Sequence, residues 1–89
     1  APGYPACPDH SEKTKIFSLL DVKNAIGVDL TENFAMYPTA SVSGYYFSHP
    51  MSQYFVVGKV GSDQLQDYSS RKGIDLETAQ RFLRPNLAD

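Results

Sequence analysis

The spacing of hydrophobic and polar residues changes several times along the chain, and the first change separates an extended start from a helix. Prolines at positions 2, 5 and 8 remove backbone donors and favour extended backbone, so the opening residues should not be helical. Gly3 can adopt a positive φ or allow another molecule to approach the backbone closely. A helix should begin after Asp9, which has the capping-box spacing to Glu12, and should end at Gly27. Its apolar stripe is Ile16, Phe17 and Leu20.

The middle of the chain loses the helical spacing. Residues 28–36 should be extended and residues 37–41 should form a turn. Two strands rich in aromatic and β-branched residues are then predicted at 42–48 and 54–60, joined as an antiparallel hairpin by residues 49–53. Both strands are apolar on both faces, whereas a sheet in a small domain commonly has one wet face. We therefore expect this aromatic hairpin to be covered by helices on one side and by a ligand or another domain on the other.

The last third of the chain predicts two short helices. Ser62 should cap the first and Gly73 should end it, and Asp75 should cap the second. The second helix has an apolar face and should stop at Pro85; that face is Leu76, Ala79, Phe82 and Leu83. The fold class is thus α+β, with one helix, a small antiparallel sheet made by the aromatic hairpin, and two C-terminal helices.

Composition and charge narrow the function classes. With 89 residues the chain is one small domain or part of a larger one, and 42% hydrophobic with 20% charged residues is ordinary for a globular protein. A net charge of −2 without a basic cluster gives no support for nucleic-acid binding. No stretch is long and apolar enough for a bilayer, and the first residues lack the basic-then-apolar pattern that is typical of a signal peptide. Cys7 is the single cysteine, so an internal disulfide is excluded and a cytoplasmic location is expected.

Few residues are candidates for metal binding, catalysis or ligand binding. Cys7 and His10 have a metal-ligand separation, but a structural zinc site needs four ligands and His49 is the only other histidine. A Cys nucleophile lacks an orienting third group, so a small buried Cys at a helix start is the favoured interpretation. His49 should simply be solvated or hydrogen-bonded in its loop. The aromatic residues should mostly form core, although a platform for a planar or cationic ligand is the alternative.

Several longer stretches resemble a known family. Ala-Pro-Gly-Tyr-Pro-Ala-Cys-Pro-Asp-His at 1–10 and Thr-Glu-Asn-Phe-Ala-Met-Tyr-Pro-Thr-Ala-Ser-Val-Ser-Gly-Tyr-Tyr-Phe-Ser-His-Pro at 31–50 closely resemble the activation domain of cobalamin-dependent methionine synthase. Arg-Lys-Gly at 71–73 and Phe-Leu-Arg-Pro-Asn-Leu at 82–87 are similar to its C-terminus. The resemblance implies that residues 1–89 are the C-terminal part of this S-adenosylmethionine-binding domain, a fragment of a larger activation domain.

The function implied by the resemblance is reactivation. The domain presents S-adenosylmethionine for the reductive methylation of cob(II)alamin, within a methyltransferase of methionine biosynthesis. Cobalamin is bound mainly by another domain of the same enzyme, and flavodoxin or a flavoprotein reductase supplies the electron. Nucleic acid and membrane are not expected partners. The resemblance implies positioning rather than catalysis by side chains of this domain, so the fragment alone should not be catalytic.

The resemblance also implies site residues. The family's S-adenosylmethionine motif is Arg-x-x-x-Gly-Tyr; Gly3 and Tyr4 match its last two positions, and the Arg position falls before Ala1. An acidic residue from an earlier part of the domain binds the ligand's amine. Tyr54 and Phe55 lie where the family contacts the ligand again, through backbone groups of a strand edge. The 36–44 loop should approach the corrin. With only part of the motif, the 89 residues alone should bind S-adenosylmethionine weakly or not at all.

The alternative is a stand-alone protein similar to the activation domain. Such a protein would use the same fold and its aromatic surface for binding or docking, without methyltransferase activity. The gene upstream of Ala1 separates the two hypotheses. Cobalamin-, folate- and homocysteine-binding modules there indicate the synthase, whereas a nearby start codon favours the stand-alone protein.

Overall fold

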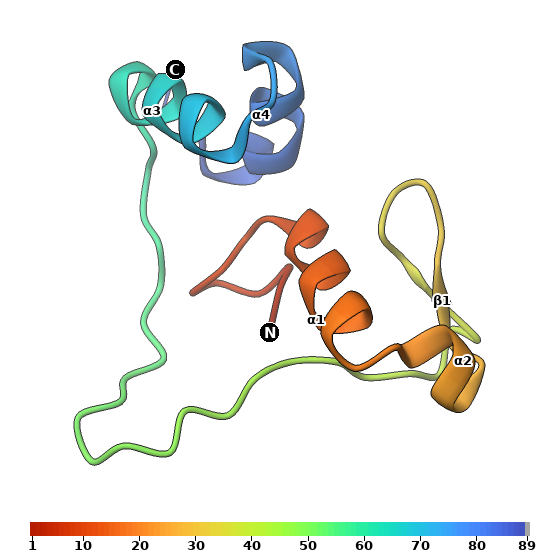
Figure 1. Cartoon of the computed structure of the whole chain (residues 1–89). Helices are drawn as coiled ribbons and strands as arrows, with labels where there is room; N and C mark the ends of the chain where they lie inside the picture. The colour runs from red at the N-terminus through yellow and green to blue at the C-terminus, as the bar shows by residue number, and fades with distance from the viewer. Residues whose placement is uncertain (89) are drawn as a thin grey trace.

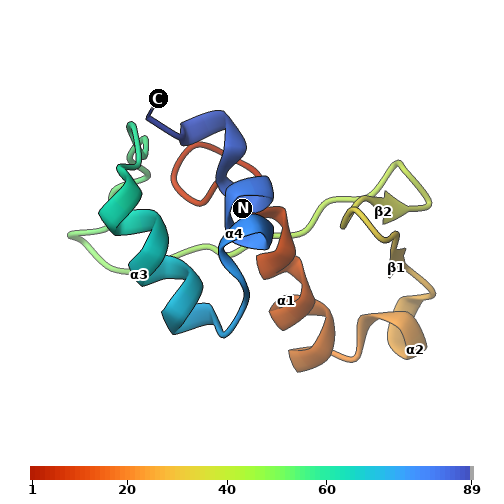
Figure 2. The same cartoon turned by 90° about the horizontal axis from the view of Figure 1, so that it is seen from above.

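The computed structural model describes residues 1–88, and in this range it contains four α-helices and one two-stranded antiparallel sheet (Figure 1). The α+β class predicted from the sequence is therefore confirmed. In chain order the elements are η1 (His10–Glu12), α1 (Lys13–Leu19), α2 (Val22–Ile26), β1 (Asp29–Leu30), β2 (Met36–Tyr37), α3 (Ser62–Lys72), α4 (Leu76–Leu83) and η2 (Arg84–Asn86). Seen from above, α3 and α4 lie on one side of α1, with α2 and the sheet on the other (Figure 2). No helix among residues 1–88 combines the length and the apolar character that a membrane span requires.

The main core lies between α3 and α4. Leu65 on α3 and Ala79 and Leu83 on α4 are each at most 5% exposed. The flanks of this core are partly buried hydrophobic residues: Val60, Tyr68, Ile74 and Leu87. The predicted apolar face of the second C-terminal helix is therefore the face that packs, except that Leu76 remains 41% exposed.

The ends of these two helices follow the predicted signals, with one correction. Gly73 adopts a left-handed conformation (φ 72°) and ends α3, and the Asp75 side chain accepts a hydrogen bond from the Thr78 N–H at 2.8 Å at the start of α4. Ser62, predicted as the cap of α3, is instead its first helical residue. Gly61 occupies the cap position, and the Gln64 side chain accepts a hydrogen bond from the Gly61 N–H at 2.8 Å.

The predicted helix from Asp9 to Gly27 is two helices. Asp9 is the cap, as expected: its side chain accepts a hydrogen bond from the Ser11 N–H at 2.8 Å. The helix then breaks after Leu19, because Asp21 adopts a left-handed conformation (φ 47°) that Asp tolerates better than most residues. Gly27 ends α2 with φ 71°, as predicted.

The sheet is not where the sequence placed it. Its two strands pair Asp29 with Tyr37 and Leu30 with Met36. Three of these residues lie in the 28–36 stretch predicted as extended, and Tyr37 is the first residue of the predicted turn. Residues 42–48 and 54–60 contain no strand apart from an isolated bridge between Val60 and Leu87. Figure 1 shows residues 38–60 as a long loop that runs below α1 and then returns to α3. The predicted aromatic hairpin is therefore wrong for this chain.

A physical reason for this error lies in what a strand requires. A helix satisfies its own backbone groups, but a strand needs neighbours, and an isolated two-stranded hairpin is marginal in water. Residues 42–60 form no helix and no paired strand apart from the bridge at Val60, and residues such as Val42 (97% exposed) and Tyr46 (98% exposed) are left uncovered. Their sequence has strand character, but they do not join the two-stranded β1–β2 sheet that residues 1–88 contain.

Candidate functional site

The N-terminal segment folds into a tight loop around Gly3. The Gly3 N–H donates to the Cys7 carbonyl at 2.8 Å, the Tyr4 N–H donates to the Ala1 carbonyl at 3.1 Å, and the Cys7 N–H donates to the Tyr4 carbonyl at 2.9 Å. Gly3 has φ 90°, a conformation that L residues rarely adopt. The prolines thus prevent a helix, as predicted, but the segment is a closed loop rather than an extended arm. We refer to residues 1–7 as the N-terminal loop.

The α-carbon of Gly3 lies against the imidazole of His10. A β-carbon built on Gly3 would be 2.2 Å from His10 Cε1 and 2.5 Å from Nδ1, distances that no real side chain tolerates. The sequence suggested two reasons for a glycine at position 3, a positive φ or the close approach of another molecule, and the positive φ is observed. The close approach is also observed, but the group that approaches is a side chain of the same chain.

Two of the four predicted site residues line one groove, whose volume is about 330 Å³. The groove lies between the start of the N-terminal loop and the aromatic part of the 38–60 loop. Its walls are Ala1, Pro2, Ala6, Cys7, Glu12, Lys15, Tyr45, Phe47, Gln53, Tyr54 and Phe55. Gly3 and Tyr4 follow these first residues directly but do not themselves line the groove, and the Tyr4 ring is 67% exposed. The structure therefore brings Tyr54 and Phe55 beside the loop that carries Gly3 and Tyr4.

The aromatic wall of the groove is a row of three rings. The Tyr45 and Phe47 centroids are 6.0 Å apart with planes tilted by 35°, and those of Phe47 and Tyr54 are 6.2 Å apart with planes tilted by 43°. The Phe47 N–H also donates to the Tyr54 hydroxyl at 3.0 Å, which ties the two sides of the row together. Rings arranged in this way offer faces to a planar or cationic group. The platform alternative from the sequence therefore has a geometric basis.

A hydrogen bond attaches the second half of the 38–60 loop to the N-terminal loop. The Val57 N–H donates to the Pro5 carbonyl at 2.9 Å, and Asn86 Nδ2 donates to the Val57 carbonyl at 2.8 Å. The N-terminal loop is thus connected, through one residue, to the C-terminal end of the chain. This connection fixes the side of the groove that carries Tyr54 and Phe55.

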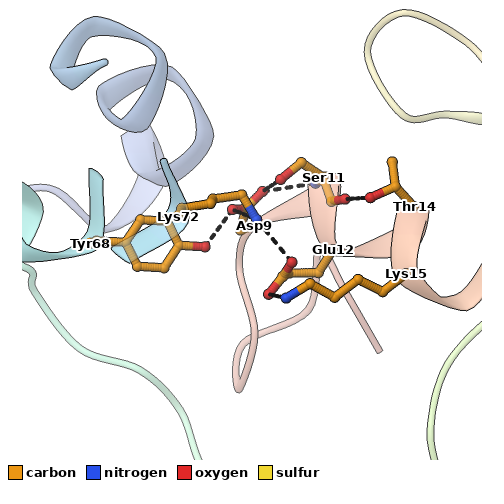
Figure 3. Close-up of polar contacts among 7 residues, drawn as sticks. All are labelled: Asp9, Ser11, Glu12, Thr14, Lys15, Tyr68 and Lys72. Carbon is orange, nitrogen blue, oxygen red and sulfur yellow. Dashed lines mark hydrogen bonds and ion pairs between the residues drawn. The ribbon is translucent and has the colours of Figure 1, made fainter. Parts of the chain in front are cut away.

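A partly buried polar cluster joins η1 and its cap residue Asp9 to α3 (Figure 3). Asp9 is 2% exposed; its Oδ1 accepts from the Ser11 N–H and from the Ser11 hydroxyl at 2.6 Å, and its Oδ2 accepts from the Tyr68 hydroxyl. Lys72 Nζ lies 3.5 Å from Asp9 Oδ2 and 2.8 Å from Glu12 Oε2. The cap predicted at Asp9 is therefore also a link to a helix 59 residues further along the chain. We call Asp9, Glu12, Tyr68 and Lys72 the polar clamp.

The ionisation of the clamp follows from its contacts. Burial disfavours the Glu12 carboxylate, but the hydrogen bonds from Lys72 and Lys15 outweigh burial and lower the pKa of Glu12. Burial likewise disfavours the Lys72 ammonium, but the Glu12 hydrogen bond and the Asp9 charge outweigh it and raise the pKa of Lys72. Burial, with the hydrogen bond to Asp9, raises the pKa of the Tyr68 hydroxyl. At neutral pH Glu12 is therefore a carboxylate paired with the Lys72 ammonium, and the Tyr68 phenol is neutral.

The remaining chemical candidates take local structural roles. Burial, followed by the charges of Glu12 and Asp9, raises the pKa of the Cys7 thiol, which disfavours the thiolate that a nucleophile requires. His49 Nδ1 accepts a hydrogen bond from the Met51 N–H at 3.0 Å, so the loop-bound interpretation of His49 is confirmed. Among residues 1–88 no three His, Cys, Asp or Glu side chains come together as a metal-binding group.

Sequence reasoning did not find the polar clamp or the contact between His10 and Gly3. Tyr68 and Lys72 are four residues apart on α3, and this spacing was the available signal that they share a face. Nothing in the local sequence indicates that this face meets Asp9. The contact of His10 with Gly3 likewise depends on how the N-terminal loop closes.

Comparison with known proteins agrees with the resemblance. The family model for the activation domain of vitamin B12-dependent methionine synthase matches residues 1–73. A solved structure described as the MetH reactivation domain bound to AdoHcy is 54% identical, with a TM-score of 0.96. The match covers 100% of this chain and 27% of that one, so the chain spans about a quarter of the length of the protein it matches. The chain belongs to the family of vitamin B12-dependent methionine synthase activation domains.

Proposed function

We propose that this chain supplies part of an S-adenosylmethionine site, which presents the ligand for the reductive methylation of cob(II)alamin in cobalamin-dependent methionine synthase. The observation that carries the proposal is the likeness to a reactivation domain bound to AdoHcy, at 54% identity over the whole of this chain. AdoHcy is S-adenosylmethionine without the sulfonium methyl group, so a site that holds one has the shape to hold the other.

The groove beside the N-terminal loop fits part of such a ligand. Its volume of about 330 Å³ is at the small end of ligand pockets. The row of Tyr45, Phe47 and Tyr54 offers faces that stack on adenine and attract a sulfonium cation. Gly3 and Tyr4 follow the groove residues Ala1 and Pro2 in the N-terminal loop but do not line the groove, so their assignment rests on their match to the family motif. We assign Gly3, Tyr4, Tyr54 and Phe55 to ligand binding on these grounds.

The role of this chain in the reaction would be positioning. Cobalamin, bound mainly by another domain of the whole enzyme, would supply the nucleophile that accepts the methyl group. The residues of this chain would hold the ligand so that its methyl group points toward that domain, which is a contribution of orientation rather than of bond making. Flavodoxin or a flavoprotein reductase would supply the electron. The whole enzyme would be the methyltransferase, and this chain alone would not be catalytic.

Calorimetric titration with AdoHcy tests the proposal. We expect a complete activation domain that includes this chain to bind AdoHcy, and Phe55→Ala to weaken that binding by about fivefold, since an aromatic contact contributes about 1 kcal/mol. Tyr37→Ala is the matched control, because Tyr37 is an exposed aromatic residue that does not line the groove. Absence of AdoHcy binding by the complete domain would contradict the proposed function. Submillimolar binding by the 89 residues alone would contradict the assignment of only part of the site to this chain.

Tyr4→Ala in the whole enzyme separates a ligand role from a structural one. We expect the substitution to slow reductive reactivation and to leave primary turnover unchanged, because only reactivation uses S-adenosylmethionine. Both rates are measured on the same preparation. An equal loss of the two activities would show that Tyr4 is structural.

A further inference from the structure

We infer that His10 is a positioning residue for S-adenosylmethionine: its imidazole supports Gly3 from behind and thereby fixes the N-terminal loop in the shape that meets the ligand. This inference rests on the proposed function and deepens it. The ring lies against the Gly3 α-carbon, so closely that a β-carbon there would be 2.2 Å from Cε1. The loop is also held by its own backbone hydrogen bonds, by the bond from Val57 to Pro5 and by the packing of Ala1 against Gly44.

Lys13 holds the imidazole in place. Lys13 is 7% exposed, and its Nζ lies 2.9 Å from His10 Nδ1 and 2.9 Å from the Phe34 carbonyl, to which it donates. An ammonium has donors and no acceptor, so in this contact Nδ1 must be the acceptor. The contact therefore requires a neutral imidazole with its proton on Nε2. A buried lysine directed at an imidazole and a carbonyl fixes the ring plane that Gly3 contacts.

The charged groups around His10 come from three parts of the chain. Lys13 lies on α1, Asp9 directly precedes His10, and Glu32 and Arg81 line with it a cavity of about 170 Å³ that Phe34 and Phe82 also border. Burial, followed by the charge of Lys13, lowers the pKa of His10, and Asp9 opposes that change. Protonation would place a second cation beside the Lys13 ammonium and remove one of its two acceptors, leaving the Phe34 carbonyl. As the pH falls through the lowered pKa, the ring should leave its position and the loop should loosen.

The first arm of the test follows the loop without ligand. The complete activation domain, labelled with ¹⁵N at glycine, is titrated from pH 7.5 to pH 5 by NMR. We expect the Gly3 amide resonance to follow the ionisation of His10, with a midpoint below 6.5. Lys13→Met should raise this midpoint, because a neighbouring cation is removed. Lys23→Met is the control: Lys23 is exposed and pairs with Asp29 at 3.1 Å, so its loss should leave the midpoint unchanged.

The second arm measures AdoHcy affinity by calorimetry over the same pH range. We expect the AdoHcy affinity to fall as the pH is lowered, with the same midpoint as the Gly3 resonance. In Lys13→Met the midpoint of the affinity change should rise together with that of the Gly3 resonance. His10→Asn keeps an acceptor near the position of Nδ1 but removes the ring. It should weaken AdoHcy binding by about tenfold at pH 7.5 and abolish the pH dependence.

The outcomes distinguish this inference from the proposed function. Absence of AdoHcy binding by the unsubstituted domain contradicts the proposed function, whatever the Gly3 resonance does. Binding with the same pH profile in the unsubstituted domain and in His10→Asn overturns the positioning role. An unchanged midpoint in Lys13→Met overturns the role of Lys13. If His10→Asn fails to fold, the Lys13→Met and Lys23→Met variants still test the inference, because both retain the imidazole. The inference then requires that Lys13→Met, and not Lys23→Met, shifts the midpoints of the Gly3 resonance and of AdoHcy affinity.

Discussion

The C-terminal helical pair (residues 61–88) and the 38–60 loop both contain many apolar side chains, but only the pair buries them. In the pair, Leu65, Ala79 and Leu83 are at most 5% exposed. In the loop, Val42 and Tyr46 are almost fully exposed. The two regions differ in how their backbones complete their hydrogen bonds, not in how hydrophobic their residues are. Each helix completes its own hydrogen bonds and needs one apolar face as a partner, whereas a strand needs other strands before its side chains can be covered.

The largest effect is expected in the helical pair. Leu83→Ala in the 89-residue chain should lower the free energy of unfolding by about 2–5 kcal/mol, because it removes a buried side chain and leaves a cavity between α3 and α4. Urea denaturation followed by circular dichroism measures the change. Val42→Ala is the control from the loop; at 97% exposure it should change stability by less than about 0.5 kcal/mol. Similar losses in both variants would mean that the contrast between the two regions is false.

An intermediate effect is expected where the helical pair meets the N-terminal region. Asp9→Asn should lower the free energy of unfolding by roughly 1.5–3 kcal/mol, because it replaces the charged acceptor of Tyr68 and removes the charge opposite Lys72. The matched control is Asp67→Asn on α3, the helix that carries Tyr68 and Lys72. The Asp67 pair with Arg71, at 2.9 Å, is exposed, so its loss should cost little. Equal small effects in the two variants would show that the polar clamp does not join the two parts.

The same comparison explains how much of the molecule the sequence could predict. Helix ends depend on neighbours within four residues, so Asp9, Gly27, Gly73 and Asp75 were predicted correctly as caps or terminators. Strand pairing depends on residues that can be far away, and the strands at 42–48 and 54–60 were placed wrongly because strand propensity says nothing about a partner. The break at Asp21 was missed because a single left-handed residue leaves the apolar pattern intact.

The candidate site shows the same division. The resemblance placed Gly3, Tyr4, Tyr54 and Phe55 in it, and the structure brings the aromatic pair to a groove beside the N-terminal loop. Their roles in binding stay predictions. The supports of the loop were not predictable from local sequence. His10 meets Gly3 only after the loop has closed, and the polar clamp forms only when α3 reaches Asp9 from 59 residues away.

The smallest effect is expected in the 38–60 loop, and it tests whether the exposure of that loop is intrinsic. Tyr46→Ser should change the free energy of unfolding of the 89-residue chain by less than about 0.5 kcal/mol, since the side chain is 98% exposed. This chain matches 27% of the length of the AdoHcy-bound relative, and strands apolar on both faces are typical of a sheet covered on both sides. In a complete activation domain the same substitution should therefore cost more than about 1 kcal/mol. A negligible cost in both proteins would show that Tyr46 stays exposed to solvent in the complete domain as well, and that no further strand covers this loop.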